Sequence, residues 1–190
     1  VTDTKFKHYL FDIEMFAHIN VGGIMSGALT TGDTLTGGTS GATGVIESVT
    51  TEGSATITGA TVADPVVVTM SGGHNFTDGQ QVAISSVAGM TDINDTWVVK
   101  NTTATTFELF EYISATNIQP LDGTSFSAYT SGGTAKHTTI VLNNVQGEFV
   151  GGETITAPTN SRTGTVQQDS LGCKGFEQKE FGQTKGISMA

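Results

Sequence analysis

The sequence predicts an all-β protein, and three observations support this prediction. The 190 residues include 25 Gly but only 3 Pro, a composition that favours many short strands joined by tight turns over helices. No segment carries a sustained apolar repeat of 3.6 residues, the period of an amphipathic helix. Between residues 64 and 110, strand and turn signals alternate about every 8–12 residues, the spacing of a small barrel or sandwich.

A sequence unit that occurs twice organises the rest of the chain. Residues 29–46 and 149–166 align without gaps and share the order Gly, acidic residue, Thr-Leu/Ile-Thr and turn. In each copy one apolar residue, Leu35 or Ile155, lies between two threonines, the alternation of a half-buried strand. The turn and the β-branched run after it predict a returning strand. We therefore expect two related β-hairpins that pack together, since one hairpin is too small to form a core.

Because the two units flank the middle of the chain, we expect that middle to be an insertion. The predicted host β domain comprises residues 1–59 and 138–172, and an extended C-terminal tail covers residues 173–190. The predicted insertion is a small β-barrel or sandwich module, residues 60–137. Its strands are expected over 65–70, 81–84, 96–101 and 106–110, and a long loop over most of 111–137.

The opening segment, residues 4–21, has the pattern of a strand with apolar side chains on both faces. Phe11 and Phe16 fall on opposite faces because side chains alternate along a strand. Such a strand is either central to the core of its own domain or covered on one side by another chain. We predict that residues 5–20 lie partly in a contact between chains of a homo-oligomer.

The charge and cysteine content exclude several classes of protein. The formal net charge is −10, and between Lys7 and Lys136 only Lys100 is basic, so a phosphate backbone would find little to bind and we expect no nucleic-acid partner. Cys173 is the single cysteine, which excludes an intrachain disulfide and a cysteine-rich zinc site. No apolar run approaches membrane-spanning length, so we expect no membrane partner.

Five separated motifs in the middle of the chain carry a family resemblance. They are Gly73-His74-x-Phe76-x-Asp78-Gly79-x-x-Val82, Gly89-Met90-Thr91-x-Ile93-Asn94, Trp97-x-Val99, Thr106-Phe107-Glu108-Leu109 and Tyr129-x-Ser131-Gly132-Gly133-Thr134. In this order they resemble a small β module of bacteriophage virion proteins, one that is similar to the first catalytic-cysteine half-domain of ubiquitin-activating enzymes. The resemblance covers about residues 64–137 and implies a fold and a setting. It implies no ubiquitin chemistry, because no cysteine lies within it.

The hairpin units and the opening segment carry a second resemblance. Gly-Asp/Glu-Thr-Leu/Ile-Thr and Ser-Gly-Ala-Thr-Gly in the units are similar to repeats of large tail proteins of tailed phages. The run Phe-Lys-x-Tyr-Leu-Phe-Asp-Ile-Glu-Met resembles segments of the same proteins, particularly from viruses of marine cyanobacteria. Together the resemblances imply a structural protein of the virion whose partners are other virion proteins.

The residue types that could carry chemistry are few, and each has a structural explanation. His74 follows two glycines, so we expect it to bond to backbone in a turn. Asp92-Ile-Asn-Asp95 has only part of a calcium-loop pattern, lacking its Gly and distal Glu. Asp33 and Glu153 occupy equivalent turns, where capping of backbone N–H groups is expected; if the units pack about a pseudo-twofold axis, the two acids could instead meet around a cation. His8 and His18 could approach across strands but lack further ligands. We predict no catalytic residues, no cofactor and no metal.

Two functional classes follow. The favoured one is a non-catalytic structural component of a tailed-phage virion, associated with the tail or tail fibre; a capsid decoration protein is a variant of it. The alternative is a carbohydrate-binding adhesin module that recognises host-surface glycan, in which Trp97, Tyr112 and Tyr129 would offer stacking faces. Burial distinguishes them, because Trp97 is expected to be buried in a structural protein and solvent-facing beside polar groups in a sugar site.

Overall fold

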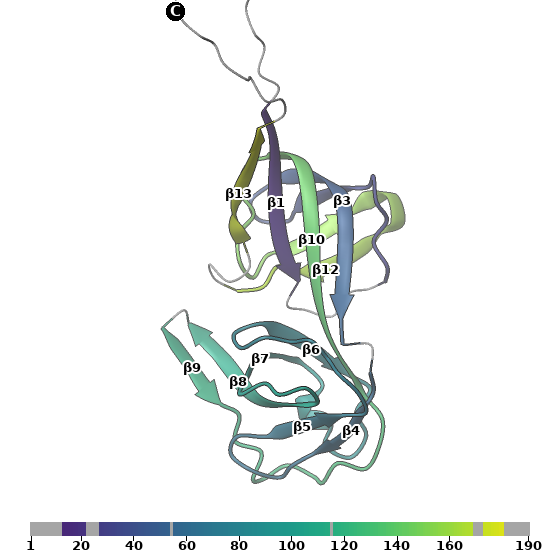
Figure 1. The fold of residues 1–190 in the computed structure, drawn as a ribbon, viewed down its shortest axis with the longest axis vertical. Helices are drawn as coiled ribbons and strands as arrows, with labels where there is room; N and C mark the ends of the chain where they lie inside the picture. The colour runs from purple at the N-terminus through teal and green to yellow at the C-terminus, as the bar shows by residue number, and fades with distance from the viewer. Residues whose placement is uncertain (1–12, 22–26, 54, 115, 169–172, 181–190) are drawn as a thin grey trace, which may run out of the picture.

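The computed structural model describes residues 13–21, 27–53, 55–114, 116–168 and 173–180, and it forms two lobes (Figure 1). Its regular structure in these ranges consists of antiparallel strands and two short 3-10 turns, Thr91–Ile93 and Pro158–Asn160. The all-β prediction is confirmed. No helix in the described part of the chain is long and apolar enough to cross a membrane.

The first lobe, which we call the host lobe, contains both hairpin units. Its strands are hydrogen-bonded in the order β12-β11-β2-β3-β10-β1-β13, and an isolated bridge joins Val21 of β1 to Val166 just after β12. The strands are β1 (Ile13–Val21), β2 (Thr34–Gly37), β3 (Thr43–Glu52), β10 (Thr134–Gln146), β11 (Thr154–Ala157), β12 (Arg162–Thr165) and β13 (Cys173–Glu180).

The second lobe, which we call the module lobe, lies between β3 and β10 in sequence. Its strands follow the order β6-β7-β8-β5-β4, β9 pairs with β8, and β6 pairs with the first residues of β10. The strands are β4 (Ile57–Ala60), β5 (Val67–Met70), β6 (Gln81–Ser85), β7 (Thr96–Lys100), β8 (Thr106–Ser114) and β9 (Asn117–Pro120).

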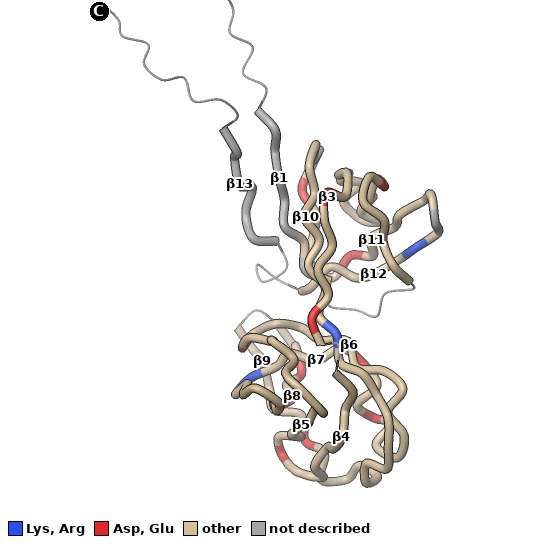
Figure 2. The backbone as a smooth tube through the Cα atoms, turned by 45° about the vertical axis from the view of Figure 1, so that its right-hand side comes forward, with Lys and Arg blue, Asp and Glu red and all other residues tan. Residues whose placement is uncertain are grey.

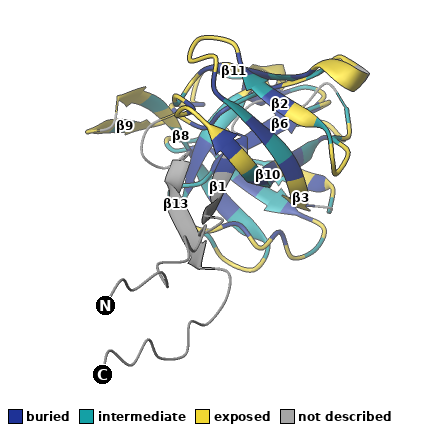
Figure 3. Cartoon of the chain, turned by 90° about the horizontal axis from the view of Figure 1, so that it is seen from above, coloured by how far each residue is buried: buried dark blue, intermediate teal, exposed yellow. Residues whose placement is uncertain are grey.

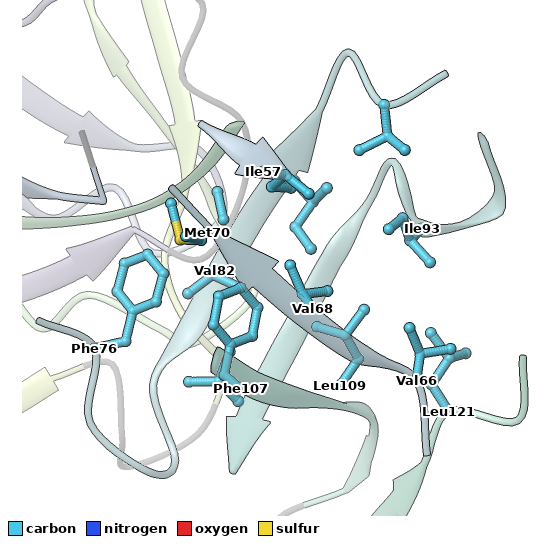
Figure 4. Packing of buried hydrophobic residues seen from close by; sticks show 14 of the residues in the cluster. Ile57, Val66, Val68, Met70, Phe76, Val82, Ile93, Phe107, Leu109 and Leu121 are labelled. Atoms are coloured by element: carbon cyan, nitrogen blue, oxygen red, sulfur yellow. The ribbon is translucent and has the colours of Figure 1, made fainter. Parts of the chain in front are cut away.

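Each lobe has its own hydrophobic core, and the two cores share no residue. In the module lobe the core forms because alternate residues of each strand point inward; on β5, Val68 and Met70 are buried while Val67 and Thr69 are half-buried. Phe107, a large and fully buried side chain, lies among Val68, Val82 and Phe76 (Figure 4). The host core gathers Leu35 and Ile155 of the two hairpin units with residues of β1, β3 and β10: Ile19, Ile46, Ile140 and Leu142.

On β6, the residues that face the module core and those on the opposite face are both buried. Val82 and Ile84 enter the module core, while Gln81 and Ala83 on the opposite face are also buried. In contrast, the β8–β9 hairpin extends beyond the lobe and is mostly exposed (Figure 3). The inner edge of the module lobe is therefore covered by the host lobe, and its outer edge is not.

A single long strand, β10, belongs to both lobes. Thr134–Lys136 pair with β6 of the module lobe, and the residues that follow pair with β1 and β3 of the host lobe. His137 lies opposite Glu52, the last residue of β3, and Thr134 is bridged to Thr56 just before β4. The module lobe is thus the connection between two neighbouring antiparallel strands, entered and left at adjacent positions.

The element boundaries differ from expectation in three places. The predicted end of the insertion, residue 137, falls inside β10, and β4 begins at Ile57, before the predicted start at residue 60, yet belongs to the module sheet. The expected loop over 111–137 contains the end of β8 and all of β9; this hairpin projects from the lobe, so no clean apolar alternation marked it in the sequence. Part of the expected tail, Cys173–Glu180, is a strand paired with β1 of the same chain. Residues 1–12, which include Phe11, and 181–190 lie outside the described residues.

The adjacency of Glu52 and His137 yields a test of separability. Replacing residues 53–136 with the two-residue turn Asn-Gly should leave a host lobe that unfolds cooperatively, because this turn joins antiparallel neighbours and the host core contains no module residue. Thermal unfolding followed by circular dichroism checks this. Loss of cooperative unfolding in the shortened chain, with the full chain as control, would show that the host lobe depends on the module for its core.

Candidate functional site

The two hairpin units are related by a local pseudo-twofold arrangement. β2 pairs with β3 and β11 with β12 at equivalent residues, as Thr34↔Val45 and Thr154↔Thr165 show. The units meet edge to edge through β2 and β11, where Thr36 pairs with its own counterpart Thr156. Their leading turns also match, since Gly32 and Gly152 both have positive φ and bond to the equivalent carbonyls of Ile46 and Val166. The two units therefore share the same strand pairing and the same leading turn.

The carboxylate of Glu153 fastens one unit to the turn of the other. Its Oε2 accepts hydrogen bonds from the backbone N–H groups of Thr39 (3.0 Å) and Ser40 (2.9 Å) in the first unit. Its Oε1 accepts from the Ser40 hydroxyl (2.9 Å) and from the Val150 N–H (2.7 Å) in its own turn. Glu153 is buried, so these four donors replace the water that a carboxylate requires.

The environment of Glu153 favours its charged form. Burial raises the pKa of this carboxyl, but the hydrogen bonds from Ser40, Val150 and Thr39 together outweigh burial and lower the pKa below its ordinary value. Gly37 leaves room for the group, since a Cβ at that position would lie 2.7 Å from both carboxylate oxygens. Glu153 therefore acts as an anionic cap for the Gly-rich turn, the capping role expected for it. The carboxylate oxygens that a shared cation would need are engaged with these N–H and O–H donors.

A second polar cluster, which we call the junction cluster, joins the two lobes. It consists of Gln81 of β6, Gln167 and Gln168 after β12, and His137 of β10. The Gln81 N–H donates to Gln167 Oε1 (3.2 Å), and the Gln168 N–H donates to Gln81 Oε1 (3.2 Å). Gln167 Nε2 donates to the carbonyl of Gly79 (3.4 Å). These bonds tie residues 79–81 of the module lobe to the end of the second hairpin unit.

His137 completes the junction cluster as a neutral histidine. Its Nδ1 lies 2.8 Å from the Gln81 carbonyl oxygen, which can only accept, so Nδ1 carries the proton. Its Nε2 lies 3.5 Å from the Thr139 hydroxyl. The ring is only 1 % exposed, and burial lowers its pKa despite the opposing effects of the Gln81 bond and the Glu52 charge.

The aromatic residues predicted for interaction are mostly built into the module lobe. Trp97 is half-buried against the module core, and its Nε1–H donates to the Ile93 carbonyl (2.8 Å). Tyr129 is also half-buried there, with its hydroxyl 2.8 Å from the Ile57 carbonyl and 3.1 Å from that of Gly132. Tyr112 lies farther out on β8, opposite Ile118 of β9. The backbone of Phe16 pairs with Glu177 of β13.

The remaining candidate groups are likewise bonded within the fold. His74 is buried; its Nδ1 accepts from the Phe76 N–H (3.0 Å), and its ring stacks on that of Phe76 with centroids 4.7 Å apart. Asn94, in the calcium-like stretch, bonds through its side chain to both backbone groups of Val87. Among the described residues no three His, Cys, Asp or Glu side chains come together as metal ligands. His8 lies outside those residues, so its approach to His18 stays a prediction.

The sequence did not single out the junction cluster. Its members are separated by up to 87 positions, and each one is an ordinary polar residue within or beside a strand. A partial signal was present in Gln81, which opens the otherwise apolar run of β6. A polar side chain in a strand that is otherwise apolar indicates that a hydrogen-bonding group packs against that face of the strand.

Comparison with known proteins identifies one similarity. Residues 63–139 match the family model of the ubiquitin-activating enzyme E1 FCCH domain. The match covers most of the module lobe and ends within β10, which supports the expected likeness of the module. No curated protein matched the chain. Figure 2 shows acidic residues on both lobes and far fewer basic ones, as expected from the net charge of −10.

The cap formed by Glu153 is open to a direct test. Glu153→Gln should lower the free energy of unfolding by about 1–3 kcal/mol, because an amide NH2 must then face one of the N–H or O–H donors. Glu148→Gln removes the same charge from an exposed residue nearby and should change little. Chemical denaturation measures both variants, and equal losses of stability would contradict the capping role.

The lowered pKa of Glu153 also predicts how the stability of the unmodified chain and of Glu153→Gln depends on pH. Its contribution to stability is complete above the ordinary carboxyl pKa of 4.5 and is lost as the pH falls through the lower value in the folded protein. The stability difference between the unmodified chain and Glu153→Gln should therefore shrink on acidification below about pH 4.5. Denaturation curves at several pH values check this, and a difference that stays constant down to pH 2 would contradict it.

Proposed function

We propose that this protein is a non-catalytic structural component of a tailed-phage virion, associated with the tail or tail fibre. The proposal rests on two resemblances. The repeats and the opening segment resemble tail proteins of tailed phages, and the module resembles a small β module of bacteriophage virion proteins. A protein with this role is expected to persist as a rigid, assembled part rather than to turn over a substrate.

One observation supports the non-catalytic role most directly. The polar side chains that the sequence offered for chemistry are used to bond backbone groups of the chain itself: Glu153 caps a turn, His74 holds the turn before Phe76, and His137 bonds to β6. General acids, bases and nucleophiles need a polar atom directed at a substrate. In this protein those atoms form hydrogen bonds with backbone groups of the chain itself.

The fold also suits the display of one lobe on another. The module lobe enters and leaves the host lobe at adjacent residues, so it can project from an assembly formed by the host lobe without interrupting that lobe's sheet. We expect the partners to be other virion proteins and further copies of this chain, with the segment around Phe16 contributing to the contact between chains. The net charge of −10 keeps such a particle surface soluble.

The adhesin alternative receives less support from the described aromatic residues. A sugar-stacking platform needs an open ring face beside polar groups. Trp97 and Tyr129 instead pack against the module core and direct their polar atoms at backbone carbonyls. Tyr112, on the projecting β8–β9 hairpin, is the residue to substitute if glycan binding is found.

Labelling of intact particles tests the proposal. Antibodies raised against the recombinant chain should decorate the tails of purified virions of the phage that encodes it, in electron micrographs with gold-labelled secondary antibody. Preimmune serum is the control. Labelling of the capsid surface would favour the decoration variant, and detection in infected-cell lysate with none in purified virions would overturn the structural role.

A further inference from the structure

We propose that the junction cluster is an acid-sensitive hinge: protonation of His137 releases the module lobe from the host lobe while both lobes stay folded. The inference does not depend on where the protein acts. It follows from the position of one neutral, buried histidine at the point where β10 passes from one lobe to the other.

A second proton on His137 would place a positive charge on a ring that is buried away from solvent. Its Nδ1–H is already donated to Gln81, so the new proton would go to Nε2, which lies 3.5 Å from the Thr139 hydroxyl. A hydroxyl oxygen gives a cation little compensation for lost hydration. The closed junction therefore disfavours the charged ring, and any arrangement that exposes the ring to water favours it.

The charged groups around His137 do not reverse this preference. Glu52 on β3 lies opposite His137 in the strand register and is the only described acid whose charge acts on the ring, and it partly favours the cation. Lys136 precedes His137 on β10 and is exposed, and its charge opposes a second positive charge nearby. From β6 and from the segment after β12, the facing side chains are the uncharged Gln81, Gln167 and Gln168. Burial wins over Glu52, as the lowered pKa of His137 shows.

The bonds that the glutamines make in the junction cluster are ones that water can replace. Three of its bonds, those of Gln167 and Gln168, are long at 3.2–3.4 Å and join neutral amides, which water can replace when the lobes separate. The two cores share no residue and would remain intact. Gly53, with φ of 81°, lies where β3 ends and the chain enters the module lobe.

The size of the effect follows from proton linkage. A histidine exposed in the open state has a pKa near 6.5, so lowering the pH from 7.5 to 5.0 multiplies the open-to-closed ratio by up to about 30. This window lies above the ordinary pKa of the carboxylates, so acids such as Glu153 remain charged throughout it. A change confined to this window would therefore come from histidine.

Energy transfer between two dyes on the full chain tests the hinge. Cysteines introduced by Thr31→Cys on the host lobe and Ser127→Cys on the module lobe, both exposed positions, carry the dyes in a Cys173→Ser background. Single-molecule transfer should show a second, more widely separated population that grows between pH 7.5 and 5.0. Circular dichroism and Trp97 fluorescence over the same range should remain native, because the lobes stay folded.

His137→Gln is the decisive variant, since its amide can still donate to the Gln81 carbonyl but cannot take up a proton. Its transfer distribution should not change with pH. If this variant does not fold, imidazole NMR of the unmodified chain replaces it, and the titration of His137 should coincide with the opening. Gln167→Ala should raise the open population already at pH 7.5. The proposal is overturned by a flat response of the unmodified chain, by an unchanged response in His137→Gln, or by unfolding of both lobes at the same pH.

Discussion

β10 is hydrogen-bonded on both edges, and both lobes depend on that arrangement. On one edge it pairs with β3 and is then bridged to Thr56; on the other it pairs with β1 and then with β6. One continuous strand therefore supplies pairing partners to the sheets of both lobes and connects them through its backbone. The junction cluster adds a second connection beside the first. Together, β10 and the junction cluster define the orientation of the two lobes, whereas β10 alone would let one lobe rotate against the other.

The host lobe shows how a duplicated hairpin can make a larger sheet. Pairing of β2 with β11 joins the copies at equivalent residues, so the same backbone pattern is used twice. The copies then differ at the acidic position, where one has Asp33 and the other Glu153. The longer side chain of Glu153 reaches the turn of the other unit at Thr39 and Ser40. Glu153 thus acts both as a cap of its own turn and as a link between the two units.

Local sequence patterns predicted the parts of the fold whose contacts are local. The hairpin units, β5 to β7 and the start of β8 all lie where alternation and turn residues placed them, because a strand with one buried face repeats its apolar residues every second position. Elements without that signal were missed. β9 lies on a projecting hairpin with exposed faces, and the exit boundary was hidden because β10 is uninterrupted. The bond between His137 and Gln81 spans 56 positions, a contact that only the three-dimensional arrangement reveals.

The adjacency of Glu52 and His137 has a consequence for how the chain folds. Without the module lobe in place, β10 would find β3 only by closing a disordered loop of more than eighty residues, at an entropic penalty that grows with the logarithm of its length. The folded module lobe holds its two ends together, since Thr56 and Thr134 are bridged within it. The pairing of β10 with β3 then closes only a short loop. If each halving of the loop length saves about 0.6 kcal/mol, the entropic penalty falls by about 3 kcal/mol. The insertion thus acts as an internal template for the sheet that carries it.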